Sequence, residues 1–201
     1  MAKTESKQKK AVKTPPSPKA EQAICVTCGF CCDGTLFDHA VLQPGEKGHL
    51  PEYMERTYFK NEKGEYFKLP CEYFDEKCSI YDQKKAQICS AFRCQLLKDF
   101  SKKKITQGNA KKLVKNAKDQ RNEILALSEK VLHTPENIPF RKLLLELRDI
   151  NNARKENDHP NPELEILIAR CNIFEALLLR YFKSEKDFNS MKVPTQNPDP
   201  K

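Results

Sequence analysis

The chain has 201 residues, a formal net charge of +8 and 32% charged residues, and it contains no tryptophan. This length allows one compact domain, or one small domain with a helical extension. The longest apolar region, residues 164–182, is interrupted by Glu165, Arg170, Glu175 and Arg180, which excludes a transmembrane helix and a membrane partner. The first residues contain no apolar run of the kind found in secretory signals, so we expect a cytoplasmic location.

Both ends of the chain have the composition of tails. Residues 1–22 are rich in lysine and include Pro15, Pro16 and Pro18. Because such a segment has too little apolar surface to form a core, we predict a disordered basic tail. Residues 190–201, which include Pro194 and Pro198, are predicted to be disordered as well.

Residues 23–100 are predicted to form a small domain with little regular structure. Two runs rich in aromatic residues, 56–60 and 65–69, flank a four-residue loop that ends at Gly64, a pattern typical of a β-hairpin. That hairpin would bring Cys71 back toward the start of the domain. A short helix is also predicted between Pro44 and Tyr53.

Residues 101–189 have helical periodicity and are predicted to form about three amphipathic helices. The apolar positions of the first two are Leu113, Ala117, Ile124, Leu125, Val131 and Leu132, and then Phe140, Leu143, Leu144, Leu147 and Ile150. The third helix is predicted to start at the N-cap Asn161, with Pro162 in its first position. Its apolar stripe comprises Leu164, Leu167, Ile168, Cys171, Phe174, Leu178 and Phe182.

Cysteine is the residue type that carries chemistry here. Eight of the nine cysteines lie in the predicted small domain: Cys25, Cys28, Cys31, Cys32, Cys71, Cys78, Cys89 and Cys94. The total is odd, Cys31 and Cys32 are adjacent, and a reducing cytosol does not support stable disulfides. Dense cysteines in such a chain ligate metal more often than they form disulfides. We therefore predict that all eight are candidate metal ligands.

The spacing Cys25-x2-Cys28-x2-Cys31 doubles the C-x2-C step that both zinc and iron–sulfur sites use. A doubled step suits three corners of a [4Fe–4S] cluster with a fourth ligand from elsewhere, and it suits zinc equally. Adjacent Cys31 and Cys32 would point in different directions from an extended backbone. They are therefore expected to reach different centres, or opposite sides of one polynuclear centre. Two four-cysteine sites, or one cluster with several non-ligating cysteines, both fit this spacing.

The ordered set Cys25-x2-Cys28-Gly29-x-Cys31-Cys32, Pro70-Cys71, Cys78-Ser79-Ile80-Tyr81 and Cys89-x2-Phe92-x-Cys94 resembles the YkgJ-type cysteine-cluster family. Its CxxCxxCC domain is described as zinc- or iron-chelating, and a related pattern in flagellin lysine-N-methylase is associated with an iron–sulfur cluster. The resemblance covers residues 25–94 and implies metal chelation at these eight cysteines. This chain has Asp82-Gln83-Lys84-Lys85 where the family has Arg-Pro, so no role of that arginine carries over.

The remaining candidates have simpler interpretations. Cys171 lies on the apolar stripe of the last helix and is predicted to be a buried core cysteine. The histidines His39, His49, His133 and His159 are predicted to be ordinary loop or surface residues, although His39 is the best placed to replace a thiolate.

Lysines concentrate at the start of the helical region: Lys98, Lys102, Lys103, Lys104, Lys111, Lys112, Lys115 and Lys118, against the single acid Asp99. A basic run beside metal-binding cysteines raises nucleic-acid binding as an alternative. A solvated helix face is the more usual role for lysines. Lysines would also balance the negative charge that four thiolates leave on a zinc ion or a cluster.

The predicted fold class is mainly α with a small β-hairpin, an irregular metal-stabilised cysteine-cluster domain followed by about three amphipathic helices. The predicted function is a metal-chelating protein that holds Zn²⁺ or an iron–sulfur cluster. One alternative is a metal-stabilised interaction module that binds nucleic acid or an acidic protein through its basic helices. Another is an iron–sulfur redox protein or enzyme component. The sequence contains no catalytic motif that we recognise, and a zinc with four cysteine ligands has no open position for hydrolysis.

Overall fold

The structure of the protein is a computed structural model that describes residues 18–153 and 161–183. The helices are α1 (Pro18–Cys28), α2 (Glu52–Arg56), α3 (Gln87–Ala91), α4 (Gln95–Ser101), α5 (Gln107–Leu132), α6 (Phe140–Ala153) and α7 (Pro162–Tyr181). The strands are β1 (His39–Leu42), β2 (Tyr58–Asn61), β3 (Gly64–Lys68), β4 (Phe74–Asp75) and β5 (Lys77–Cys78). The fold is mainly α with a small antiparallel sheet, as predicted.

The predicted hairpin is confirmed and is part of a larger sheet. Strands β2 and β3 pair antiparallel with Asn61 opposite Gly64, and β1 pairs with the other edge of β3, which gives the order β1-β3-β2. The sequence patterns did not predict β1. A second, two-stranded sheet joins β4 to β5.

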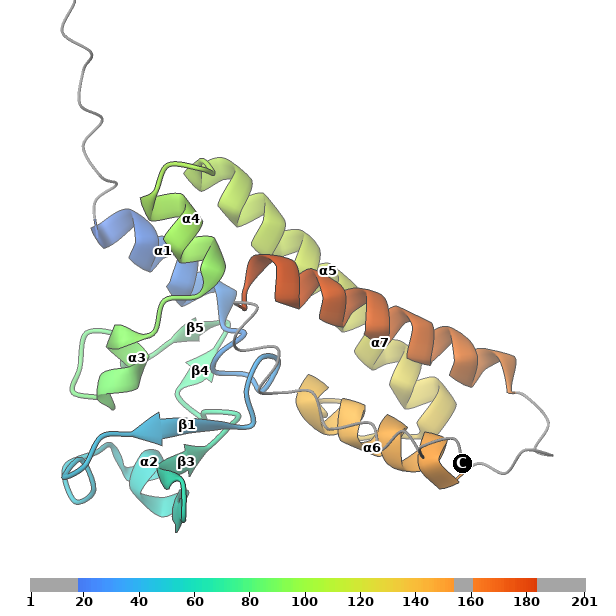
Figure 1. Ribbon diagram of the computed structural model, residues 1–201, viewed down its shortest axis with the longest axis horizontal. Coiled ribbons are helices and arrows are strands. Elements are labelled where there is room, and N and C mark those ends of the chain that lie inside the picture. Colours follow the sequence, from blue (N-terminus) through green and yellow to red (C-terminus); the bar gives the residue numbers. More distant parts are fainter. Residues whose placement is uncertain (1–17, 154–160, 184–201) are drawn as a thin grey trace, which may run out of the picture.

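The three predicted helices of the C-terminal half are also confirmed. Helix α5 packs along α7, and α6 lies beside them (Figure 1). Asn161 caps α7 through its side chain, which accepts from the N–H groups of Glu163 and Leu164, and Pro162 opens the helix. The predicted stripe of α7 is buried from Leu164 to Phe182, with Ile168 half-buried.

Two predicted boundaries differ from the structure. Helix α1 begins at Pro18, inside the predicted tail, because Ala20 packs against the core and Glu21 forms an ion pair with Arg93 at 2.5 Å. The predicted helix between Pro44 and Tyr53 is a loop, and α2 covers residues 52–56 instead. The reason is that the carboxylate of Glu55 accepts hydrogen bonds from the backbone of Gly48 and Leu50, which folds this loop back onto α2. The tails at 1–17 and 190–201 lie outside the described residues.

Two hydrophobic clusters of very different size stabilise the described chain. The larger contains 20 buried residues and joins α1, α4, α5, α6 and α7, with Phe30, Phe140 and Phe174 at its centre. The smaller contains 6 buried residues, among them Met54 and Phe67, beneath the three-stranded sheet. The larger cluster includes Ile24 and Phe30 from the cysteine region, so the core crosses the predicted domain boundary near residue 100. In Figure 1 the sheets lie below α1 and α4, to one side of the long helices.

None of the helices in the described segments combines the length and the apolar character that a membrane crossing requires.

Candidate metal centre

The turn that carries Cys28 to Cys32 depends on Gly29. Helix α1 ends at Cys28, and Gly29 follows with φ of +76°, in the left-handed region. The backbone N–H groups of Cys32 and Asp33 both donate to the Gly29 carbonyl, at 2.7 and 2.9 Å. The backbone at Cys31–Cys32 is therefore a tight turn and not the extended segment that was predicted. A Cβ at Gly29 would lie 1.8 Å from the ring of Phe74, so the β4–β5 hairpin packs directly on this turn.

An ion pair fastens the same turn to the helical core. The Arg121 guanidinium on α5 donates to the Asp33 carboxylate and, at 3.3 Å, to the Thr35 hydroxyl. Both charged side chains are mostly buried, at 17% and 16% exposure. The Arg121 guanidinium also lies 5.6 Å from the ring centre of Phe30. The residues next to Cys31 and Cys32 are thus held by a helix almost ninety positions further along the chain.

The eight predicted ligands divide into two sets according to the core that they contact. Cys25, Cys28, Cys31 and Cys94 pack against the larger cluster, and we call them the inner set. Cys71 belongs to the smaller cluster, with Cys32 and Cys78 packed against it. Cys89, an exposed residue on α3, belongs to neither cluster, but its neighbouring thiols are Cys71 and Cys78, and we call Cys32, Cys71, Cys78 and Cys89 the outer set. The adjacent pair is divided: Cys31 is inner and Cys32 is outer.

The leading electrostatic neighbour of each inner thiol for which one is resolved is another inner thiol. Burial is the main reason why the pKa of Cys25 is raised to about 11. The neighbouring thiol of Cys94, and then that of Cys78, raise this pKa further. Burial holds the pKa of Cys31 well above its usual value, with Cys28 and Cys94 as the leading neighbours. Burial also raises the pKa of Cys28, partly offset by the backbone N–H of Phe30. The pKa of Cys94 is raised by burial and lowered in part by the N–H groups at the start of α4.

The outer thiols influence one another in the same way. Burial raises the pKa of Cys32, and its leading neighbours are Cys71 and Cys89. Although Cys89 is an exposed residue, desolvation of its thiol together with Cys71 and Cys78 raises its pKa to about 12. Burial raises the pKa of Cys71 too, with Cys78 as its leading neighbouring thiol. The thiols of Cys32, Cys71 and Cys89 are therefore protonated at neutral pH, and a metal would displace their protons on binding.

The two sets adjoin one another. Strand β5, which carries Cys78, contacts α1, and the N–H of Cys71 donates to the carbonyl of Cys32 at 2.7 Å. Six of the eight thiols, those of Cys25, Cys31, Cys32, Cys71, Cys78 and Cys89, line one cavity of about 350 Å³. Aromatic and aliphatic side chains such as Phe67, Phe74 and Ile88 form most of the rest of its wall. Cys25 and Cys89, which are 64 positions apart in the sequence, thus line the same cavity.

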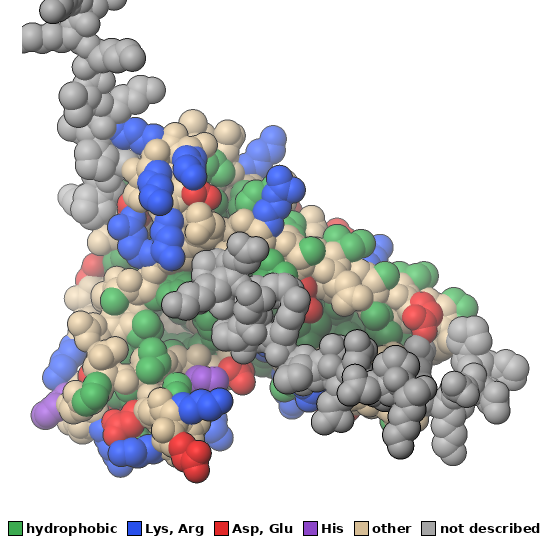
Figure 2. Space-filling model, viewed as in Figure 1, with side chains coloured by type: hydrophobic (Ala, Val, Ile, Leu, Met, Phe, Trp, Pro, Cys, Tyr) green, Lys and Arg blue, Asp and Glu red, His purple; other side chains and the backbone are tan. Residues whose placement is uncertain are grey.

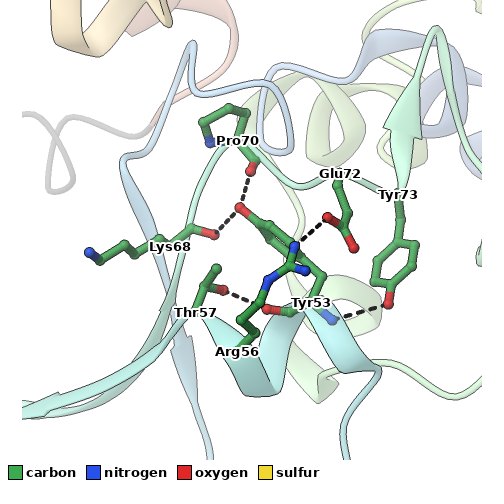
Figure 3. Close-up of polar contacts among 7 residues, drawn as sticks. All are labelled: Tyr53, Arg56, Thr57, Lys68, Pro70, Glu72 and Tyr73. Carbon is green, nitrogen blue, oxygen red and sulfur yellow. Dashed lines mark hydrogen bonds and ion pairs between the residues drawn. The ribbon is translucent and has the colours of Figure 1, made fainter.

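A polar network around α2 positions the segment that carries Cys71 (Figure 3). The Tyr53 hydroxyl donates to the carbonyl of Pro70, the residue directly before Cys71. The backbone N–H of Tyr53 donates to the Tyr73 hydroxyl at 3.2 Å. Arg56 pairs with Glu72 at 2.6 Å. Residues on both sides of Cys71 are therefore attached to one short helix.

The thiols lie in one region, but they do not surround a common point as metal ligands do. In residues 18–153 and 161–183, no three Cys, His, Asp or Glu side chains meet with the geometry of a metal site. Cys171 is 1% exposed in the larger core, which confirms the prediction of a core cysteine.

The described histidines occupy exposed positions, as predicted. His39, His49 and His133 all lie at the surface, while His159 lies outside the described residues. The Nδ1 atom of His39 is 2.7 Å from the Asp38 carboxylate, and its ring stands edge-on to Tyr66.

Four residues that build this region were not singled out from the sequence: Asp33, Tyr53, Phe74 and Arg121. Each acts through a contact with a distant segment, such as Arg121 with Asp33 or Phe74 with Gly29. Local patterns contain no signal for such contacts.

No family model, curated protein or solved structure matches this chain.

Proposed function

We propose that this chain is a metal-chelating protein whose eight cysteines bind zinc or an iron–sulfur cluster. The observation that carries the proposal is the convergence of all eight on one region, in two sets of four. Thiolates are the preferred ligands of zinc and of iron–sulfur clusters. Four thiolates match a closed zinc site or the four corners of a cubane cluster.

The division of the adjacent pair favours two centres over one. Cys31 contacts the larger core and Cys32 the smaller one, so a single four-ligand centre would have to take thiols from both. In the inner set, Cys94 supplies the remote fourth ligand that the run Cys25-x2-Cys28-x2-Cys31 requires in a [4Fe–4S] site. A bound metal would require the sulfur atoms of each set to lie closer together than they do in the described residues.

Metal analysis with a visible spectrum on anaerobically purified full-length protein tests this proposal. Two zinc ions per chain and no colour would indicate two four-cysteine zinc sites. Brown colour with equal amounts of iron and sulfide would indicate a cluster. Protein that contains no metal after anaerobic purification, and that takes up neither zinc nor iron with sulfide, would refute the proposal.

An interaction module is the second candidate. Lysine and arginine side chains gather on the face where α1 and α4 lie (Figure 2), and the segment from α4 into α5 carries the exposed Lys102, Lys111 and Lys112. Such a face attracts phosphates or an acidic protein. Binding to nucleic acid that weakens steeply with salt, and that is lost when Lys111 and Lys112 are changed to glutamine, would support this candidate.

A further inference from the structure

Cys89 and Cys94 are the last ligands of their sets and lie only five positions apart, yet their helices are anchored very differently. Cys89 lies in α3, a helix of 5 residues with no buried residue and no side-chain N-cap bond. Its Ile88 is half-buried against the smaller core of 6 buried residues. A short helix with so little buried apolar surface opens at low free-energy cost.

Cys94 is held by a much stronger arrangement. It is the N-cap residue of α4, which buries Leu96, Leu97 and Phe100. These side chains belong to the larger cluster of 20 buried residues, and the N–H of Gln95 donates to the carbonyl of Phe182 at the end of α7. Displacing Cys94 would therefore disrupt the core that joins five helices.

A carboxylate at the surface ties α3 to the rest of the chain. Glu46 accepts from the backbone N–H of Gln87, the first residue of α3, at 2.6 Å through one oxygen. Its other oxygen accepts from the N–H of Gln43 at 2.7 Å, directly after β1. Both hydrogen bonds are exposed to solvent, so they position Cys89 without burying it.

From these contrasts we propose that the outer set exchanges its metal with solution and the inner set does not. This inference rests on the proposed metal-chelating function. Movement of α3 detaches the Cys89 thiolate from the metal, and a donor atom of an incoming thiolate or chelator takes its place. The ion then leaves with the incoming ligand, its charge unchanged, and the freed cysteine thiolates take protons from water. The inner centre keeps its ion because its ligands are part of the helical core.

The test uses the full chain loaded anaerobically with zinc and then mixed with an excess of a chromophoric chelator. Two zinc ions are expected to leave in two phases of equal amplitude, one fast and one slow. Cys89→Ser is expected to bind one zinc ion, which leaves in the slow phase. Cys94→Ser, the matched variant in the inner set, is expected to lose the slow phase or to fail to fold.

A variant that keeps all eight cysteines tests the inference even if a cysteine variant fails to fold. Glu46→Ala removes the hydrogen bond that holds the start of α3 and is expected to accelerate the fast phase roughly fivefold, the equivalent of one hydrogen bond. The slow phase is expected to be unchanged. Glu52→Ala, on the exposed side of α2, is the control and is expected to alter neither phase.

The outcomes separate this inference from the function on which it rests. Release of both ions in a single phase, or a Cys89→Ser variant that keeps the fast phase, would overturn the inference and leave metal chelation standing. Equal acceleration of both phases by Glu46→Ala would overturn it too. A chain that binds no zinc and no iron would overturn both.

Discussion

At the scale of single residues, Gly29 determines the shape of the turn that carries Cys31 and Cys32. Its φ of +76° lies in the region that side chains disfavour, and the ring of Phe74 occupies the space where a Cβ would be. The glycine therefore allows both the turn and the close packing of the β4–β5 hairpin on it.

Gly29→Ala is expected to destabilise the metal-loaded protein by about 2–4 kcal/mol, from backbone strain and displacement of Phe74. The measurement is chemical denaturation followed by circular dichroism. Gly45→Ala is the matched control, because Gly45 has φ of +86° but nothing within 4 Å of its Cβ position, so only the strain, about 1–2 kcal/mol, applies. Equal losses in the two variants would show that the contact with Phe74 is unimportant.

Cys171 allows a prediction about pH at the same scale. Burial raises its pKa from 9.0 to about 12, so the folded state keeps this proton while the unfolded state loses it above pH 9. The contribution of this thiol to stability is therefore complete below pH 9 and is lost as the pH rises toward 12. Cys171→Ala is expected to cost about 1 kcal/mol at neutral pH and to make the alkaline loss of stability less steep.

The measurement for Cys171 is urea denaturation of the zinc-loaded protein between pH 7 and the highest pH at which it stays folded. The free energy of unfolding is compared between the wild type and Cys171→Ala at each pH. Parallel curves for the two proteins would contradict the assignment of this thiol to the alkaline loss.

At the scale of elements, α5 does more than fill the core. The Arg121 side chain reaches from α5 to Asp33 and Thr35, beside the divided pair Cys31–Cys32. The long helix α5 thereby anchors the turn that carries these two cysteines.

Arg121→Met is expected to destabilise the protein by about 1.5–3 kcal/mol, because it leaves the mostly buried Asp33 carboxylate without its partner. It is also expected to weaken zinc binding, since the turn that carries Cys31 and Cys32 loses its anchor. Equilibrium denaturation and a competitive zinc titration measure the two effects. Lys115→Met removes an exposed pair with Asp119 and is expected to change either quantity little.

At the scale of the whole molecule, the two cores differ in how much they can support alone. The region of the sheets has 6 buried residues in its cluster, against 20 in the helical cluster. A structural zinc ion contributes about 10–16 kcal/mol of apparent binding free energy in small peptides, which is large beside what so small a core supplies.

Removal of metal by a strong chelator is therefore expected to unfold residues 25–94 first. The thermal transition should fall, and limited proteolysis should cut between α1 and α4 before it cuts α5 or α7. Cys28→Ser is expected to have the same effect on the inner set without a chelator. An unchanged thermal transition and an unchanged pattern of fragments would contradict a structural role for the metal.

Much of this protein could be predicted from the sequence because the signals are local. Helical periodicity and the Asn161-Pro162 cap predicted α7, the aromatic runs around residues 61–64 predicted the β2–β3 hairpin, and the position of Cys171 on a stripe predicted its burial. The cysteine spacing selected the eight candidate ligands, whose metal remains a prediction. Each of these signals lies within a few turns of one helix or the two strands of one hairpin.

Only the tertiary structure decided how the eight cysteines are grouped. The division into inner and outer sets follows from which core each thiol contacts, and those cores join segments that are far apart in the chain. The same holds for Arg121 beside Asp33, for Phe74 over Gly29 and for the contrast between α3 and α4. Spacing along the chain constrains which ligands can share a turn, whereas packing between distant segments determines which ligands can share a metal.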